Sequence, residues 1–592
     1  MKYTSLRHLH TIGFSLFLFT ATHGQSLPTP AVEIQGDRTL IYPDRMDLPP
    51  EATVWEALQL YPTLLQEGFD QVLPNYQLRL DNIALAGDPR LVLSQIKAAE
   101  VKNLQVCENP GVAKGTTGTG GIIDIRLKAS GPGTSGQVEI QAGTDSYLAP
   151  AVKVHHGNRR NDLLVYSSHT SLKATDGQLH TQKDFLHAQL HTRLSGQDEL
   201  STVFTRQSKK DENVEASSQT DKYMLRLTYT HAFDDKGTSL MALANYQHSK
   251  TPESDMGNTT QTNYRQTCTY TDLPFASVEL NLPLFAKGSS LMVGWEGDFS
   301  SINYDHEQIV GQETLIRHSH YNVTNNDIYA QLIYPVGKVT FTVGGRLLFF
   351  HYGIDSDTHQ WKNNDTHNMW QASFTWHPNP SHQLQGGYYR KFINPTYMII
   401  SQEAWPDATG STWSVGNNNL TVTNVGQVKL AYSYTRPRCI VNAGLNYFDT
   451  SDIIKKELRE DGLTTWVNAD QADAWQADLS LFYRFRTLSL TAGASFYSIN
   501  YQADDAVRKT RINYAAFRLT PLLSLPWRFR AEGQFVFFTS QAPIRTDNGN
   551  TCTYGELRLS KEIGSHLLFS AEWHDMFQSC RSAALGTVSY RF

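Results

Sequence analysis

The chain has 592 residues, of which 40% are hydrophobic and 11% are aromatic. No stretch is apolar enough to cross a bilayer as a helix, but a barrel strand turns only every second side chain to lipid and needs no such stretch. The formal net charge of −6 is small for this length and gives no reason to expect a nucleic acid partner.

The first residues of the chain predict a secretory signal. Lys2 and Arg7 precede a short apolar stretch (12–19), and small residues follow it up to Gly24. A basic start, a short apolar core and a small-residue cleavage site are typical of cleaved export signals. We therefore expect three parts: a signal peptide (1–24), a small N-terminal domain (25–130) and a large C-terminal domain (131–592).

The small N-terminal domain is expected to be mixed α/β. The run Thr53–Glu56 has the pattern of a capping box, which predicts the start of a helix. Val54 and Leu58 then fall on one face of that helix. Two further apolar stretches follow, Tyr76–Leu80 and Leu91–Val106.

A glycine-rich segment ends this domain and leads into the apolar run Gly121–Leu127. Glycine accepts backbone angles closed to other residues, so a tight bend into a buried strand is expected here. A phosphate-binding loop is the rival interpretation, but it needs Gly-x-x-x-x-Gly-Lys-(Ser/Thr) followed by a helix, and the sequence has neither. The residues that carry this motif are Pro110, Gly115, Gly118, Gly120, Gly121, Ile122 and Asp124.

From Gly136 onward the chain is a series of alternating segments. In one of them Phe535 and Phe537 point one way and Gln534 points the other. Short turns such as Asp234–Gly237 separate some of the segments. Long polar stretches, which we interpret as loops, separate the others; examples are Ser249–Asp272 and Ser300–Asn325.

Short turns and long loops in alternation are typical of transmembrane β-barrels, and the segments predict about 22 antiparallel strands. A β-sandwich or propeller also has many short strands but does not predict this alternation. The last segment places Val588, Tyr590 and Phe592 on one face. An aromatic final residue resembles the signal that the barrel-assembly machinery recognises, which makes Phe592 the candidate for that role.

These motifs together resemble TonB-dependent receptors. The segment Val101–Lys128 is similar to the end of that family's plug domain, and Thr53–Pro62 is similar to its first plug helix. Arg390–Pro395 and Gly416–Leu420 resemble paired motifs of its barrel. The resemblance implies a transmembrane β-barrel of about 22 strands with the small α/β domain as a plug inside the lumen.

The resemblance also implies a location and partners. We expect the outer membrane of a Gram-negative-type bacterium, contact with its lipid, the TonB complex as energy source, and an unknown extracellular ligand. An iron chelate, a glycan, a vitamin and a peptide all remain open as that ligand. Thr29–Ile34 matches the TonB-contacting segment of the family poorly, so a plugged binding or scaffold barrel without TonB coupling is the alternative.

No catalytic constellation and no cofactor motif stands out, and an enzyme is the third and weakest hypothesis. His318 and His320 are candidate metal ligands in a predicted loop, since imidazole is a common ligand. With 21 His in the chain, polar loops will hold several by chance. The loop tryptophans could stack on a sugar or an aromatic siderophore, or belong to the outer aromatic girdle; they are Trp361, Trp405, Trp413 and Trp466.

Overall fold

The computed structural model describes most of the chain, and no helix in the described part is long and apolar enough to cross a membrane. The described residues are 32–35, 38–45, 52–59, 76–80, 83–84, 93, 96–107, 121–128, 133–144, 146–173, 179–213, 217–256, 263–284, 288–310, 313–357, 360–395, 397–400, 404–406, 413–436, 438–502, 509–539, 553–564, 566–574 and 583–591. The expected signal peptide and Phe592 lie outside these ranges.

The N-terminal domain contains one sheet and one short helix, as expected for a small α/β unit. The sheet has the order β1-β2-β5-β6-β3-β4, in which β3 and β6 run parallel and the other neighbours antiparallel. Val54 and Leu58 of the helix are fully buried, which confirms the expected apolar face. The elements are β1 (Val32–Gln35), β2 (Arg38–Ile41), η1 (Pro43–Arg45), α2 (Val54–Gln59), β3 (Tyr76–Leu80), β4 (Ile83–Ala84), η3 (Ala98–Glu100), β5 (Val101–Cys107) and β6 (Gly121–Leu127).

The rest of the described chain forms a closed antiparallel barrel, in which the last strand pairs with β7. Its wall has 22 strands, because β20 and β21 form a short hairpin and β19 pairs directly with β22. The strands are β7 (Gly133–Gly143), β8 (Tyr147–Gly157), β9 (Asn161–Lys173), β10 (Leu179–Arg193), β11 (Asp198–Asn213), β12 (Ser217–Ala232), β13 (Ser239–Met256), β14 (Asn263–Pro283), β15 (Ser290–Val310), β16 (Glu313–Val336), β17 (Val339–Ser356), β18 (Gln360–Asn379), β19 (His382–Ile393), β20 (Ala404–Pro406), β21 (Trp413–Val415), β22 (Thr423–Arg436), β23 (Cys439–Leu458), β24 (Thr464–Arg484), β25 (Leu488–Gln502), β26 (Lys509–Ser524), β27 (Phe529–Phe538), β28 (Thr553–Ile563), β29 (Leu567–His574) and β30 (Ala583–Arg591). Two short helices, α5 (Tyr397–Ile400) and η4 (Pro526–Arg528), lie between strands.

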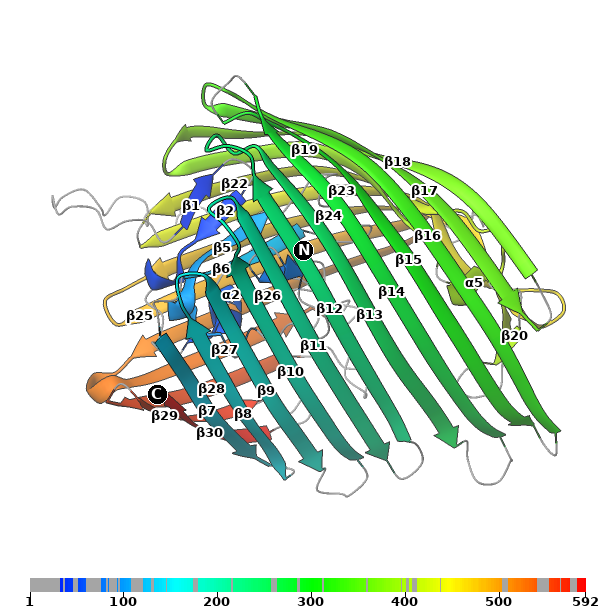
Figure 1. Cartoon of the computed structure of the whole chain (residues 1–592), viewed down its shortest axis with the longest axis horizontal. Coiled ribbons are helices and arrows are strands. Elements are labelled where there is room, and N and C mark those ends of the chain that lie inside the picture. Colours follow the sequence, from blue (N-terminus) through cyan, green and yellow to red (C-terminus); the bar gives the residue numbers. More distant parts are fainter. Residues whose placement is uncertain are drawn as a thin grey trace, which may run out of the picture.

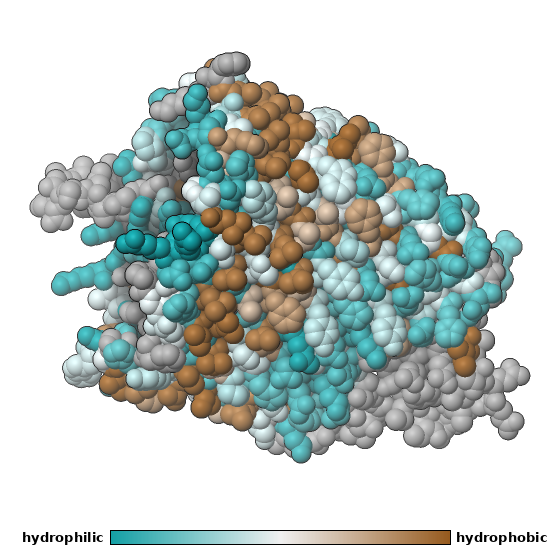
Figure 2. Space-filling model, viewed as in Figure 1, coloured by the Kyte–Doolittle hydropathy of each residue, from teal (hydrophilic) through white to brown (hydrophobic). Residues whose placement is uncertain are grey.

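The outer face of the wall is apolar over part of its height. On β17, Val343 and Leu347 are about half exposed on the outside, whereas Thr342 and Arg346, each one residue earlier, are buried inside. Figure 2 shows the apolar side chains as a brown band across the left and middle of the visible face, with a mostly polar right end. The alternation of side chains along the strands thus places an apolar surface where the hydrocarbon of a membrane is expected.

Our interpretation of the polar stretches 249–272 and 300–325 as loops is wrong, because strands β13 to β16 run through most of both. A strand of 24 residues such as β16 spans about 79 Å at 3.3 Å per residue, far more than an apolar band of about 25 Å requires even with tilt. Beyond that band the outer face of the strands meets water and carries polar side chains, so the sequence loses its apolar outer face while backbone pairing continues.

The α/β domain lies inside the barrel and is a plug. Figure 1 shows β1, β2, β5 and β6 within the barrel toward its left end, where the C-terminus also lies. The buried core of the plug includes wall side chains near the short turns, among them Leu164, Ile440 and Phe482. We call this end the turn end and the opposite end the outer end. Plug and wall therefore share one hydrophobic core.

Candidate functional site

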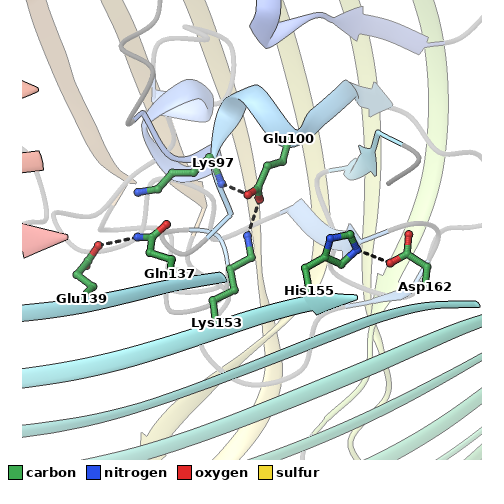
Figure 3. Close-up of polar contacts among 7 residues, drawn as sticks. All are labelled: Lys97, Glu100, Gln137, Glu139, Lys153, His155 and Asp162. Atoms are coloured by element: carbon green, nitrogen blue, oxygen red, sulfur yellow. Dashed lines mark hydrogen bonds and ion pairs between the residues drawn. The ribbon is translucent and has the colours of Figure 1, made fainter. Parts of the chain in front are cut away.

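The lumen is the candidate functional site, and near its turn end a charged contact joins plug and wall. Lys153 on β8 reaches inward, and its Nζ lies 2.5 Å from Oε2 of Glu100 in η3. The Lys153 side chain is 9% exposed, so its charge has little access to water. Glu100 also accepts a hydrogen bond from the backbone N–H of Lys97 (Figure 3). A buried ammonium needs such a partner, because desolvation without one is costly.

A second charged group lies in the middle of the wall. Arg346 on β17 donates from Nη2 to Asp327 on β16 at 2.6 Å and also pairs with Glu296 on β15. The Arg346 side chain is 2% exposed, and its guanidinium lies 5.3 Å from the ring centre of Tyr329. The cation joins three neighbouring strands on the inner face of the wall, so it is placed to hold this part of the wall rigid.

The outer end of the lumen is lined by apolar side chains, although barrel interiors are usually polar. On β17, Phe350 and Tyr352 face inward and their rings stack at 5.7 Å. The ring of Phe392 on β19 meets the ring of Phe350 edge-on, with 5.8 Å between the ring centres. The ring of His367 on β18 is tilted against Phe392, with 4.8 Å between the ring centres. We call this group the outer cluster; its buried members are Tyr321, Leu348, Phe350, Tyr352, Ile354, Met369, Phe392, Ile400, Leu420 and Val422.

Three members of the outer cluster come from the connection between β19 and β22, not from the wall. Ile400 ends α5, which lies at the right-hand, outer end of the barrel in Figure 1. Leu420 and Val422 belong to residues 414–422, which we call the strap, and are 9% and 6% exposed. The strap therefore folds inward and covers the aromatic side chains of the wall.

Polar contacts fix the strap to the hairpin β23–β24. The Asn468 side chain accepts the N–H of Thr421 at 2.7 Å and donates to its carbonyl oxygen at 3.0 Å. The amide of Asn417 donates to the carbonyl oxygen of Trp466 at 2.9 Å. Near the start of the strap, β21 pairs with β24 in parallel, with Ser414 opposite Thr464. Side-chain hydrogen bonds thus replace most of the backbone hydrogen bonds that a strand of the wall makes with its neighbours.

The glycine-rich motif is only partly described. Gly121 begins β6, where it pairs with Tyr76 of β3, and Ile122 and Asp124 are buried in the plug. Asp124 lies 2.7 Å from Nε of Arg126. The role of the motif as a tight bend remains a prediction, because Pro110, Gly115, Gly118 and Gly120 lie outside the described residues.

His318 and His320 are on strand β16 and not in a loop, and both lie toward its outer end. Nδ1 of His318 is 2.9 Å from Asp305, and this hydrogen bond raises the pKa of His318 above its ordinary value. Both ring nitrogens of His320 have partners, Asn303 and Asn322. In the part of the chain described above, no group of three or more His, Cys, Asp or Glu could hold a metal ion. A metal site at this pair stays a prediction.

The tryptophans divide into two pairs. Trp361 and Trp466 pack against the outer cluster, while nothing is described of the side chains of Trp405 and Trp413. No sequence pattern singles out Asn468 or Arg346, because a lone Asn or Arg in a strand is usually solvated.

Comparisons with known proteins agree with this architecture. Residues 231–587, more than half of the chain, match the family described as "Outer membrane protein beta-barrel family". No curated protein matches the chain significantly.

Similar solved structures include the "Copper transporter OprC" (TM-score 0.72, 12% identity, covering 96% of this chain and 100% of that one). The ferric citrate transporter FecA in its unliganded form gives a TM-score of 0.73 at 11% identity, covering 95% and 97%. The siderophore receptor PirA from Pseudomonas aeruginosa gives 0.66 at 13% identity, covering 95% and 100%. At such low identity these likenesses establish the fold alone, a large barrel with an internal plug.

The expected barrel of about 22 strands with an internal plug is thereby confirmed. The chain belongs to the outer membrane protein β-barrel family.

Proposed function

We propose that this protein is an outer-membrane receptor that imports a ligand too large for porins, and that TonB moves its plug from the periplasm. The observation that carries the proposal is the shared core of plug and wall, in which Leu58 and Ile123 of the plug belong to one cluster with Phe482 of the wall. A lumen filled in this way conducts nothing freely. Transport then needs a force on the plug, and the outer membrane has no energy source of its own.

A metal chelate is the first ligand to test. The three similar structures reported above are named for copper, ferric citrate and a siderophore. The aromatic side chains of the outer cluster are buried in this structure; when they are uncovered, their flat apolar rings suit an organic chelator. Glycan, vitamin and peptide ligands share the same architecture and are the alternatives.

The remaining assignments complete the proposal. Residues 1–24 act as the cleaved export signal, 25–130 as the plug with its periplasmic leader, and 131–592 as the barrel. Phe592 acts as the signal for the barrel-assembly machinery. The turn end of the barrel then faces the periplasm and the outer end faces the medium, as in bacterial barrels with short periplasmic turns.

Deletion of residues 25–31 tests the coupling. The variant is expected to reach the outer membrane and to bind radiolabelled ferric citrate or copper as well as the full chain does, but to accumulate neither. Accumulation that survives the deletion would reject the role of TonB, whereas a full chain that binds but accumulates nothing would favour the alternative, a plugged binding or scaffold barrel. A pull-down with the periplasmic domain of TonB separates the same two hypotheses.

A further inference from the structure

We propose that the strap is an inward-folded gate that closes the outer lumen in the resting receptor, and that the side-chain amide of Asn468 is the clasp that holds it shut. The inference rests on the proposed function only in treating the lumen as a ligand path. Its physical basis is that a small number of contacts holds the strap over the aromatic side chains of the outer cluster.

The strap covers a surface that would otherwise meet water. Phe350, Tyr352 and Phe392 line the wall from β17 and β19, and each is at most 7% exposed with the strap in place. Leu420 and Val422 pack against them. A strap that moves away uncovers a patch of aromatic side chains inside the mouth of the barrel, which is the kind of surface that marks a binding site.

Few contacts hold the strap, although Leu420 and Val422 near its end are buried. Residues 414–422 carry no charged side chain. Only Ser414 and Val415 of the strap pair with a neighbouring strand, in the described part of the chain. Asn417 also donates its backbone N–H to the carbonyl oxygen of Ile399 at 2.8 Å. The other polar contacts described for the strap involve side chains at the mouth of the barrel, where water can replace them when the strap leaves. Segments of this kind open locally at less cost than wall strands do.

Asn468 stands at the centre of these contacts. Its Oδ1 and Nδ2 bind the N–H and the carbonyl oxygen of Thr421, as the backbone of a neighbouring strand would. Nδ2 also donates to the carbonyl oxygen of Asp452 at 2.8 Å. One amide therefore joins the strap to both strands of the hairpin β23–β24.

Asp452 supplies a second, independent sign of a two-state element. Its φ is 59°, a left-handed conformation that is strained for a residue other than glycine, and the pairing of β23 with β24 shifts register there. Its carbonyl oxygen accepts from Asn468 and from Oγ1 of Thr423, the first residue of β22 after the strap. The strained bulge is thus stabilised by the closed strap.

The test measures access to the outer cluster from the medium. Ile354→Cys places a thiol in the cluster at a position that is 7% exposed. Intact cells are treated with a membrane-impermeant sulfonated maleimide, and labelling is counted above that of the chain without the added thiol. The substitution Asn468→Asp keeps the acceptor for Thr421 but places a carboxylate against two carbonyl oxygens. We expect labelling of Ile354→Cys to become about tenfold faster in this variant.

Two controls sharpen the result. Asn161→Asp makes the same chemical change on an exposed residue at the turn end of the barrel and should leave the labelling rate unchanged. The pair Ser414→Cys and Thr464→Cys replaces hydroxyls that are 2.7 Å apart, so a disulfide there should lock the strap. In the Asn468→Asp background the oxidised lock should return labelling to the slow rate, and a reductant should release it.

Equal labelling of Ile354→Cys with and without Asn468→Asp would overturn the proposal, as would fast labelling that the disulfide does not slow. If Asn468→Asp fails to assemble, the lock alone decides, since it must slow the labelling of the otherwise unchanged strap. None of these rates depends on TonB or on a ligand. A working gate in a chain that accumulates nothing would therefore reject the proposed import and leave the gate standing.

Discussion

Replacing Arg346 by Met should destabilise the barrel strongly. The guanidinium is buried between the carboxylates of Asp327 and Glu296, at 2.6 Å from the first. Removing one partner of a buried ion pair costs about 3–5 kcal/mol, because the charges left behind are uncompensated. A loss of about 1.4 kcal/mol corresponds to a factor of ten. The ratio of folded to unfolded chain therefore falls by about two to three and a half orders of magnitude.

Guanidinium unfolding of the protein in lipid vesicles, followed by tryptophan fluorescence, measures this loss. The matched control removes all three charges, with Arg346→Met, Asp327→Asn and Glu296→Gln together. We expect the triple variant to recover most of the stability, since none of the three mutually paired charges is left without its partners. A single variant within about 1 kcal/mol of the parent chain, or a triple variant less stable than the single one, would refute the reasoning.

Three further predictions concern the plug and the outer end. Glu100→Gln should weaken the plug–wall contact at Lys153 by about 1 kcal/mol, visible as faster proteolysis of the plug in the assembled barrel. Leu58→Ala should lower the stability of the plug by about 2–5 kcal/mol, because it empties a fully buried site, and hydrogen exchange should then rise in the plug and not in the wall. The hydrogen bond with Asp305 raises the pKa of His318, so its stabilising contribution is fully present below the unfolded pKa of about 6.5 and is lost as pH rises through the folded pKa. A nuclear magnetic resonance titration should show a lower pKa of His318 in Asp305→Asn, where the weaker influence of Asp357 remains, and an unchanged pKa there would contradict the assignment.

The barrel and its plug could be predicted from sequence because both depend on local patterns. Alternation along one strand places Val343 outside and Thr342 inside whatever the neighbouring strands contain. The helix at Val54 follows from a capping pattern and an apolar face within a few residues. The length of the strands beyond the apolar band could not be predicted in this way. The water-facing side of a strand carries polar residues there, and such a sequence resembles that of a loop.

The outer lumen could not be predicted because its contacts connect distant positions. Thr421 and Asn468 are 47 residues apart, and Arg346 and Glu296 are 50 apart. No local pattern distinguishes an Asn that holds a strap from one that faces water. The motifs Arg390–Pro395 and Gly416–Leu420 were visible in the sequence, and the structure brings them together, with Phe392 and Leu420 in one cluster.

The central claim is that the N-terminal domain closes the lumen of a membrane-embedded barrel. Ion conductance across a planar lipid bilayer tests it most directly, with the full mature chain compared with a chain that lacks residues 25–130, both recovered from the outer membrane. We predict no steady pore for the full chain and a large open pore after the deletion. Equal conductance of the two proteins would contradict the account.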